Sequence, residues 1–356
     1  MTVERLETYC FTIPTDETES DGTLEWSSTT IVVVEAVGGG RRGIGWTYAP
    51  EAAGGVVTEL LAPRVAGRSL DDLGALWLEL GAALRNAGRP GVAFCALSAV
   101  DLALWDLRAR LLDVPLATLV PAVHDRVAVY GSGGFCSYAD ERLAEQLGGW
   151  VAQGLDCVKM KLGREPARDP RRLTVAREAI GDAELMVDAN GAFGVKEAIR
   201  WAKRYVDEWD VRWFEEPVSS ADAKGLRRVR DDSRLEVAAG EYAYVLADFR
   251  NLLGSVDCLQ VDVTRCGGIS GLLRVNGLAA AHGLDLSGHC APQLSAHALC
   301  AVDRLRHLEY FHDHVRVESM LFDGVLTPVD GALVPDRSRP GNGLELKRAD
   351  AQRWAA

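Results

Sequence analysis

Short apolar runs, each followed at once by a carboxylate, dominate the middle of the chain. Their length and composition predict buried strands. The first residues after these strands lie 27 and 26 positions apart (215 − 188 and 241 − 215), about the length of one strand–helix unit. Three successive parallel strands would therefore each place an acid at the same end. The runs are residues 185–187 before Asp188, 211–214 before Glu215 and 237–240 before Glu241.

Strand and helix patterns alternate from about residue 126 onward. Eight candidate strands with interleaved helices, spread over roughly 190 residues, favour a (β/α)-barrel, and a doubly wound open sheet is the alternative. The candidate strands are residues 127–131, 157–162, 184–188, 211–215, 235–240, 258–263, 285–287 and 305–310. The candidate helices between them include residues 141–153, 169–180, 195–208 and 269–282.

The first 120 residues have a different pattern, strands first and helices afterwards. A β-branched run and a return strand flank a glycine-rich turn, and three helical stretches follow, which predicts a small α+β domain. We expect Asp101 and Asp106 to lie on a solvated face of the last helix. The strands are residues 29–37 and 44–48, and the helices are 56–66, 70–87 and 94–112.

Two further segments complete the predicted organisation. Residues 16–23 are polar and acidic, and as a loop they would either cover an active site or form a solvated connection. The glycine- and proline-containing tail is expected to wrap back over the small domain. We therefore divide the chain into an α+β domain at 1–122, a barrel at 123–325 and a returning C-terminal segment at 326–356.

The period of the three acids continues in both directions along the chain. Lys159 and Lys161 alternate with apolar residues, so both face the same side of their strand. Taken alone, a lysine pair is usually solvated and a histidine can be a core residue. Seven successive strands that each end in an ionisable group are a stronger signal, because burying so many charges together is costly without a function and a metal. The seven are Lys161, Asp188, Glu215, Glu241, Asp262, His289 and Glu309.

Composition narrows the possible ligands and partners. Carboxylate oxygens converging at one barrel end form a site for a hard divalent cation, Mg²⁺ before Ca²⁺ or Zn²⁺. The formal net charge of −12 argues against a nucleic-acid partner. No apolar run approaches the ~20 residues that span a bilayer, and the first 15 residues show no secretory signal. The eight cysteines lack CxxC pairing, which favours reduced thiols in a cytoplasm over a cysteine zinc site.

The motifs at these strand ends together resemble the enolase superfamily, and most of all its mandelate racemase subgroup. The resemblance covers nearly the whole chain and implies a capping α+β domain on a (β/α)7β barrel that holds one Mg²⁺. The motifs are Lys159-Met160-Lys161, Asp188-Ala189-Asn190-Gly191, Glu215-Glu216-Pro217, Gly240-Glu241, Asp262 ahead of Arg265-Cys266-Gly267-Gly268, Ser287-Gly288-His289 and Leu308-Glu309.

The resemblance also implies a role for each of these residues. The muconate-lactonising subgroup carries a second lysine base where this chain has Asp262, so a lysine–lysine mechanism is not expected. The implied roles are metal ligation for Asp188, Glu215 and Glu241, acid/base chemistry for Lys161 and for His289 oriented by Asp262, neutralisation of the substrate carboxylate by Lys159, and hydrogen-bond donation to it by Glu309.

This residue set suits removal of a proton α to a carboxylate through an enediolate, whose added charge a metal and cations must offset. Lys161 must be neutral to act as a base, and we expect Lys159 and the metal to lower its pKa. We predict a Mg²⁺-dependent dehydratase that converts a hydroxylated sugar acid into a 2-keto-3-deoxy acid. The alternatives are a racemase or epimerase of a 2-hydroxy acid and a catalytically inactive binding barrel. The resemblance further suggests a homo-oligomer.

Overall fold

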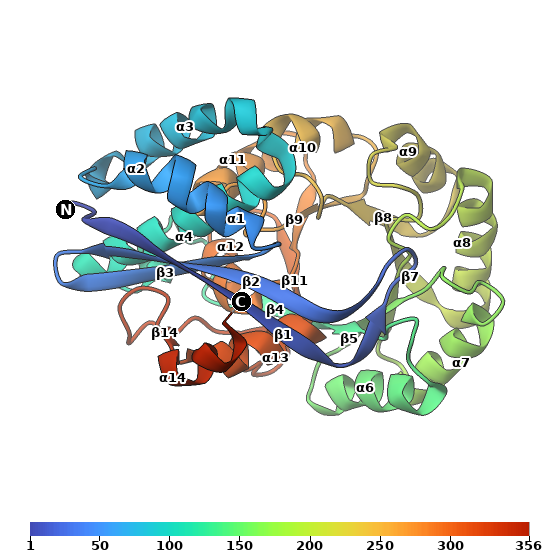
Figure 1. The fold of residues 1–356 in the computed structure, drawn as a ribbon. Helices are drawn as coiled ribbons and strands as arrows, with labels where there is room; N and C mark the ends of the chain where they lie inside the picture. Colours follow the sequence, from blue (N-terminus) through green and yellow to red (C-terminus); the bar gives the residue numbers. More distant parts are fainter. Residues whose placement is uncertain (356) are drawn as a thin grey trace.

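Eight parallel strands close into a barrel in the computed structural model, which describes residues 1–355 (Figure 1). Each strand pairs with the next, and the last returns to the first through the register Leu308↔Val129 to Phe311↔Ser132. This closure confirms the predicted barrel and excludes the open sheet. The strands are β4 (Val127–Gly133), β5 (Cys157–Lys161), β6 (Glu184–Asp188), β7 (Val211–Glu215), β8 (Glu236–Ala239), β9 (Cys258–Val261), β10 (Asp285–Gly288) and β11 (Leu305–Phe311).

A helix follows every barrel strand. In α8 the buried residues Ala198, Ala202, Tyr205 and Trp209 recur at helical spacing, so one face of the helix packs on the barrel. Seven helices lie between the eight strands, which gives the predicted (β/α)7β order, and a further helix, α13, follows β11. The helices are α6 (Asp140–Ala152), α7 (Asp169–Ile180), α8 (Val195–Trp209), α9 (Ala223–Asp232), α10 (Leu246–Leu252), α11 (Gly268–Ala281), α12 (Pro292–Leu299) and α13 (His312–Leu321).

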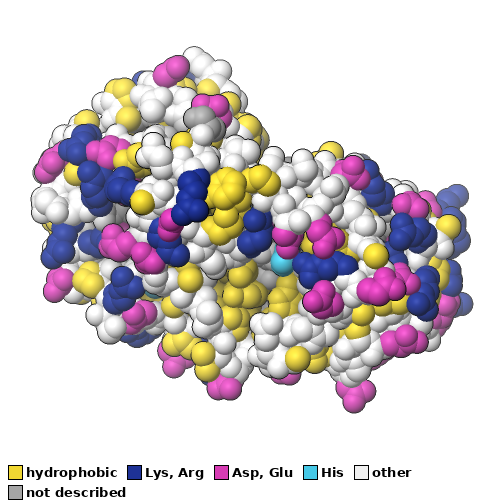
Figure 2. Space-filling view, turned by 60° about the horizontal axis from the view of Figure 1, so that its bottom comes forward, with side chains coloured by type: hydrophobic (Ala, Val, Ile, Leu, Met, Phe, Trp, Pro, Cys, Tyr) yellow, Lys and Arg dark blue, Asp and Glu magenta, His cyan; other side chains and the backbone are white. Residues whose placement is uncertain are grey.

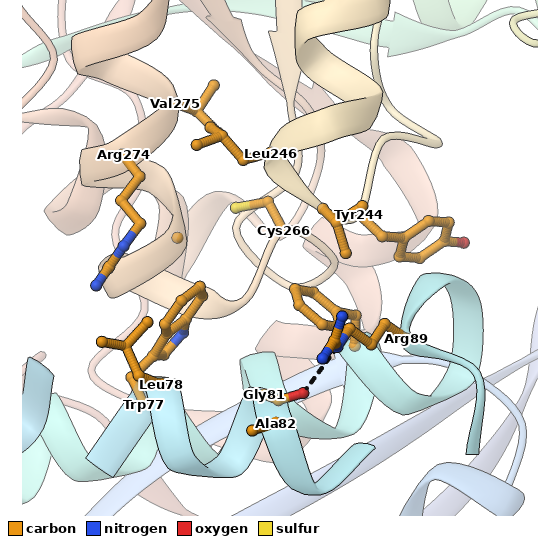
Figure 3. Close-up of a pocket in the computed structure, with 13 residues that line it drawn as sticks. Trp77, Leu78, Gly81, Ala82, Arg89, Tyr244, Leu246, Cys266, Arg274 and Val275 are labelled. Carbon is orange, nitrogen blue, oxygen red and sulfur yellow. Dashed lines mark hydrogen bonds between the residues drawn. The ribbon is translucent and has the colours of Figure 1, made fainter. Parts of the chain in front are cut away.

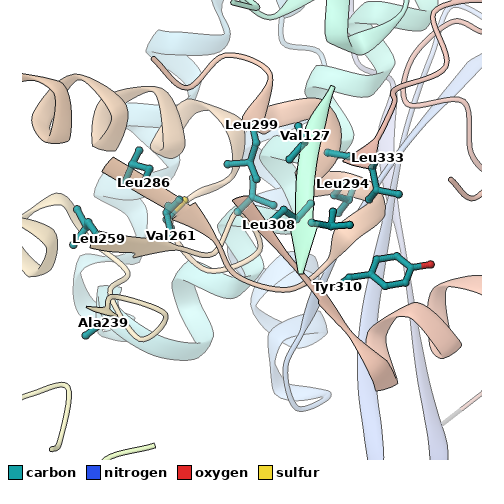
Figure 4. Packing of buried hydrophobic residues seen from close by; sticks show 14 of the residues in the cluster. Val127, Ala239, Leu259, Val261, Leu286, Leu294, Leu299, Leu308, Tyr310 and Leu333 are labelled. Carbon is teal, nitrogen blue, oxygen red and sulfur yellow. The ribbon is translucent and has the colours of Figure 1, made fainter. Parts of the chain in front are cut away.

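Large aliphatic side chains fill the space between strands and helices. Figure 4 shows Leu286, Leu299 and Leu308 packed together around β10, α12 and β11, and each is at most 1% exposed. Burial of one such side chain stabilises the fold by about 1.5–3 kcal/mol. A smaller cluster, which includes Tyr130 and Trp213, belongs to strands on opposite sides of the barrel and fills its interior. The barrel therefore has a packed floor beneath its mouth.

A three-stranded antiparallel sheet covered by helices forms the N-terminal cap. Strand β1 was not predicted, because most of its side chains are polar and only partly buried. Gly45 of β3 lies so close to α4 that an added Cβ would stand 2.5 Å from the backbone nitrogen of Ala103. The elements are β1 (Arg5–Ser20), β2 (Glu25–Gly38), β3 (Arg41–Tyr48), α1 (Ala52–Val56), η1 (Val57–Leu61), α2 (Ala62–Val65), η2 (Leu70–Asp72), α3 (Leu73–Ala83), η3 (Leu84–Ala87), η4 (Arg89–Ala93), α4 (Phe94–Leu111) and α5 (Leu116–Leu119).

Helix α4 lies at the centre of the cap. The stretch Arg89–Leu111 is apolar and long enough to cross a membrane, but 78% of its most apolar window is buried inside the protein, as in a core helix. The expectation that Asp101 and Asp106 are solvated is wrong, since both are buried. Asp101 accepts a hydrogen bond from the backbone of Ser270 in α11, whereas Asp106 accepts one from Ile44 of β3. Helix α4 is covered by α11 on one side and by β3 on the other, so neither aspartate faces solvent.

The tip of the β1–β2 hairpin reaches over the barrel mouth (Figure 1). Residues 16–20, expected in a loop, instead continue β1, and Glu19 and Ser20 are fully buried. The backbone N–H of Cys136 donates a hydrogen bond to the carbonyl of Ser20. An added Cβ on Gly22 would lie 2.3 Å from the carbonyl oxygen of Ala189, next to the end of β6. Two alternatives were expected for residues 16–23, a cover over an active site or a solvated connection. The segment lies over the barrel, as in the first alternative.

The C-terminal segment contacts the cap at two points. Arg348 forms a 2.5 Å ion pair with Glu35 of β2, and Phe11 of β1 pairs with Ala355. We retain the domain boundaries at 122 and 325 as a proposal. The elements of this segment and its approach are β12 (Phe322–Asp323), β13 (Ala332–Leu333, antiparallel to β4), β14 (Glu345–Leu346, paired with β12), α14 (Arg348–Ala351) and η5 (Gln352–Trp354).

A second junction between cap and barrel surrounds an apolar cavity of about 250 Å³ (Figure 3). Trp77 of α3 forms one wall and donates a hydrogen bond from Nε1 to the carbonyl of Gly267. The guanidinium of Arg274 lies 4.2 Å from the Trp77 ring, a cation–π contact. The loop that follows β9 is thereby fixed against the cap.

Candidate active site and metal centre

All eight predicted site residues lie together at the carboxyl end of the barrel strands. Six of them lie at the last residue of a strand or just after it, whereas Lys159 and Glu309 lie within β5 and β11. None is more than 5% exposed. The residues are Lys159, Lys161, Asp188, Glu215, Glu241, Asp262, His289 and Glu309.

The three acids form one cluster. Asp188 of β6 and Glu215 of β7 are register partners, and Glu241 follows β8 after Gly240. One carboxylate oxygen from each lies within 4.8 Å of the other two. Parallel pairing brings the strand ends level, so acids spaced by one strand–helix unit meet at one point.

The acid cluster fits a divalent cation by its electrostatics. Burial, supported by Asp188 and Glu241, raises the pKa of Glu215 to about 8 despite the opposing effect of Lys159. Glu216 is a fourth buried acid, whose pKa is raised by burial and then by Glu241. The Oε1 atom of Glu216 has no hydrogen-bond partner in residues 1–355. Several buried carboxylates lie close together and offer only oxygen atoms as ligands, which is the ligand type that Mg²⁺ prefers.

Lys159 lies beneath the acids and is fully buried. Its Nζ is 2.5 Å from Glu215 Oε1, 2.8 Å from Glu309 Oε1 and 3.5 Å from Asp188 Oδ2. Burial lowers the pKa of Lys159, but the carboxylates, Glu215 first, outweigh it and raise that pKa well above the ordinary value. Lys159 is therefore a permanent positive charge within the acid cluster.

Lys161 is the higher of the two lysines and lines the cavity above the acids. Its Nζ donates a hydrogen bond of 2.5 Å to Oδ2 of Asp188, its register partner on β6. Burial lowers the pKa of Lys161, but this carboxylate outweighs burial and raises the pKa above its ordinary value. Lys159 acts in the expected direction, since it lowers the pKa of Lys161, and the expected lowering by Lys159 together with the metal stays a prediction. A cation at the same carboxylate would compete with the ammonium for Asp188.

His289 and Asp262 form the expected pair. The Nδ1 atom of His289 is 2.7 Å from Asp262 Oδ2, while Asp262 Oδ1 accepts two hydrogen bonds from Thr264. Burial lowers the pKa of His289, but Cys290 and Glu241 lead the groups that outweigh it and raise the pKa. With Nδ1 held by the aspartate, only Nε2 is directed at the cavity.

Two residues around Glu309 and His289, Ser132 and Cys290, were not predicted. Ser132 donates a 2.6 Å hydrogen bond to Glu309 Oε1, and Cys290 Sγ lies 3.2 Å from Glu309 Oε2. Burial raises the pKa of Glu309, but Lys159 and His289 outweigh it, so the pKa falls well below the ordinary value. Glu309 is therefore ionised here and accepts hydrogen bonds. Cys290 follows His289 directly, which was the signal available in the sequence.

A cavity of about 420 Å³ lies above this cluster, and the hairpin tip forms part of its wall. The barrel supplies Lys161, Glu241, His289 and Glu309, and the cap supplies an aromatic and hydroxyl-bearing wall. Figure 2 shows acidic and basic side chains interspersed over one face of the molecule, with hydrophobic side chains gathered near its middle. Among the cap residues that line the cavity are Asp21, Trp26, Ser28, Thr29 and Tyr48.

Fold and site together define a capped (β/α)-barrel whose mouth holds a cluster of acids that could bind a metal ion, with a lysine and a histidine beside it. The family described as "Mandelate racemase / muconate lactonizing enzyme, N-terminal domain" matches residues 18–120, and "Enolase C-terminal domain-like" matches residues 142–351. The chain belongs to this mandelate racemase/muconate lactonizing enzyme family of the enolase superfamily, as the strand-end motifs indicated.

Its relatives are dehydratases and isomerases. The L-talarate/galactarate dehydratase of Salmonella typhimurium is 33% identical over 327 residues, which cover 88% of this chain and 79% of that protein. The 3,6-anhydro-alpha-L-galactonate cycloisomerase of Streptomyces coelicolor is 31% identical over 360 residues, 97% of each chain. A mandelate racemase/muconate lactonizing enzyme-like protein from Rubrobacter xylanophilus superposes with a TM-score of 0.99 at 56% identity and full coverage of both chains.

Solved relatives also hold the expected cofactor. A structure of the Salmonella typhimurium dehydratase with Mg and L-lyxarohydroxamate has a TM-score of 0.90 at 29% identity, and covers 99% of this chain and 93% of that one. The chain is thus an enzyme of enolase-superfamily chemistry with magnesium as its cofactor.

Proposed function

We propose that this enzyme dehydrates a hydroxylated sugar acid to a 2-keto-3-deoxy acid. The observation that carries the proposal is the order of groups around the barrel mouth. Lys161 ends β5 and His289 follows β10, so the two basic groups stand on different sides of the ring. Asp188 and Glu215 end β6 and β7, and Glu241 follows β8, so the three acids lie between the two bases. A carboxylate held at the acids would therefore present opposite faces of its α-carbon to the two bases.

Each base has a distinct task in this proposal. One of them removes the α-proton, and the other donates a proton to the departing β-hydroxyl, so that water leaves. Asp262 holds His289 so that Nε2 carries this proton, whereas Lys159 offsets the charge that develops on the substrate carboxylate. Glu309, positioned by Ser132, contacts the same end of the substrate. The hydroxyl-bearing cap wall, with Ser28 and Thr29, suits a polyhydroxylated ligand.

Asp188, Glu215 and Glu241 would hold the magnesium ion, which supplies Lewis-acid stabilisation of the enediolate when bound. Glu241→Gln tests this ligand set, because it keeps the side-chain volume and removes one charged oxygen. We expect Mg²⁺ affinity, measured by calorimetry, to fall by more than about tenfold. Unchanged affinity would remove Glu241 from the ligand set.

A panel of sugar acids incubated with enzyme and Mg²⁺, and assayed for 2-keto product, tests the reaction. The runner-up is a racemase or epimerase of a 2-hydroxy acid, because a base on each face can also return the proton to the opposite side. Exchange of the α-proton with deuterium without keto product would favour that reaction. No product and no exchange from any acid would support an inactive binding barrel.

Single-base variants test the two-base assignment. Lys161→Ala should abolish exchange from one enantiomer of an accepted acid, and His289→Asn should abolish it from the other. Equal effects of both variants on both enantiomers would contradict the assignment. Homo-oligomeric assembly and a cytoplasmic location accord with the family resemblance and with eight free thiols, and we propose both.

A further inference from the structure

Three different donor atoms meet at one corner of the active-site cavity, beside the acid cluster. The Nε2 atom of His289 lies 3.3 Å from Cys290 Sγ and 3.4 Å from Glu309 Oε2, and the last two atoms are 3.2 Å apart. The three residues are each at most 5% exposed and all line the cavity. They therefore form a compact triangle of nitrogen, sulfur and oxygen that is reached from the substrate cavity.

Each donor is held in its orientation by a separate contact. His289 is fixed through Nδ1 by Asp262, and Glu309 through Oε1 by Ser132 and Lys159. Both residues thus direct their remaining donor atom to the triangle. The backbone of Cys290 has a positive φ of 51°, and its carbonyl accepts a 2.8 Å hydrogen bond from Ser295. This local conformation turns the thiol towards its neighbours.

The triangle has the size that a tetrahedral zinc site requires. Zinc binds sulfur at about 2.3 Å, nitrogen at about 2.0–2.1 Å and oxygen at about 2.0–2.2 Å, so the edges of a tetrahedron lie at roughly 3.3–3.6 Å. The three measured edges fall within a few tenths of an ångström of that range. The aspartate behind the histidine reproduces the carboxylate–histidine–metal arrangement that fixes a ligating imidazole. The Oε2 atom of Glu241, buried and without a well-aligned donor, lies 3.2 Å from the same histidine nitrogen.

We propose that His289, Cys290 and Glu309 form a second metal site that binds Zn²⁺ or a similarly soft cation next to the acidic magnesium centre. A thiolate and an imidazole favour zinc, whereas the neighbouring oxygen-only cluster favours magnesium, so the donor sets separate the two metals. On binding, the thiol of Cys290 releases its proton to solvent, and so does Nε2 of His289 if protonated. Bound zinc therefore occupies Nε2 of His289, the atom that moves the proton, and inhibits the enzyme. The expected inhibition rests on the proposed function, whereas the existence of the zinc site does not.

Cobalt is the appropriate probe because it replaces zinc in such sites and reports a bound thiolate by a charge-transfer band in the near ultraviolet. The full-length protein, saturated with Mg²⁺ and kept reduced, is titrated with Co²⁺. We expect one equivalent to bind with this band and to be displaced by Zn²⁺. Cys290→Ser should lose the band, and Cys10→Ser, a matched change at a partly exposed cysteine of β1, should keep it. Loss of the thiolate should weaken zinc binding more than about tenfold.

The outcomes test the zinc site separately from the inhibition that it would cause. The same band in Cys290→Ser, or zinc that binds only by displacing magnesium, would overturn the site. In an assay of the proposed reaction, equimolar zinc should slow the native enzyme. For Cys290→Ser, the rate with zinc divided by the rate without zinc should be closer to one than for the native enzyme. If no acid supports α-proton exchange, the proposed function fails, while the cobalt band still decides the site.

Discussion

Asp262 orients His289 and is itself held in place by Thr264. Its Oδ2 lies 2.7 Å from Nδ1 of the histidine, and its Oδ1 accepts hydrogen bonds from both the backbone and the hydroxyl of Thr264, each at 2.7 Å. The pair therefore has one orientation and one tautomer that leaves Nε2 for the substrate.

Asp262→Asn should impair proton transfer at the histidine face alone. The amide cannot stabilise an imidazolium and can select the wrong tautomer, so α-proton exchange through His289 should fall about 10²- to 10⁴-fold. Exchange through Lys161 should persist. Deuterium incorporation into each enantiomer, followed by nuclear magnetic resonance, measures both faces. Asp257→Asn, at the opposite end of β9, is the matched control, and equal losses at both faces would contradict the prediction.

Glu19 should make stability depend on pH. Burial, supported by Asp313, raises the pKa of Glu19 to about 8, although Trp26 opposes this. Between its ordinary pKa of 4.5 and about 8, the folded protein keeps a proton that the unfolded chain loses, so stability falls as pH rises. The slope is at most about 1.4 kcal/mol per pH unit.

Urea unfolding of native protein and Glu19→Gln at pH 5, 6.5 and 8 measures this effect. The variant cannot titrate at this position, so its stability relative to the native protein should increase with pH. Glu17→Gln, on the same strand, should show no such trend. A native-to-variant difference that is constant over the three pH values would show that Glu19 does not keep its proton.

Asp106 should contribute strongly to stability because it joins three parts of the chain. It accepts hydrogen bonds from the backbone of Ile44 in the cap sheet and of Asn342 in the tail, and from Arg110 in its own helix. Asp106→Ala leaves these donors without a partner and Arg110 without its buried counter-ion. We expect a loss of about 3–5 kcal/mol in the free energy of unfolding.

Chemical denaturation measures that loss, with Glu145→Ala as a control. The Glu145 carboxylate is 76% exposed and contacts Arg142 only at 3.5 Å, so its removal should cost less than about 1 kcal/mol. A cost for Asp106→Ala no larger than this would mean that the tail is held mainly by other contacts, such as Arg348 with Glu35.

Sequence periodicity favoured the barrel over an open sheet and brought the predicted site residues to one end of the strands. Asp188, Glu215 and Glu241 each follow a buried strand at nearly equal spacing, and parallel register brings such positions to one level. Only the relation between neighbouring strands is needed for that inference. No knowledge of how the rest of the chain packs is required.

What the sequence could not show depends on packing between distant segments. Asp101 and Asp106 have the spacing of a solvated helix face, but the cap sheet and α11 enclose that helix. Strand β1 has few buried side chains, so its periodicity is weak until its pairing with β2 is known. The pKa of Lys161 is raised by its short contact with Asp188. That contact depends on how the two side chains are oriented, which the sequence does not show.

Gly22 determines how closely the hairpin tip lies against the barrel. A methyl group at this position would stand 2.3 Å from the carbonyl oxygen of Ala189, so any other residue would hold the tip away from the end of β6. Water would then have a wider route to the carboxylates and bases beneath, and the electrostatic interactions there would weaken. A single position in the cap thus controls the dielectric environment in which the barrel's charged groups act, without contacting any of them.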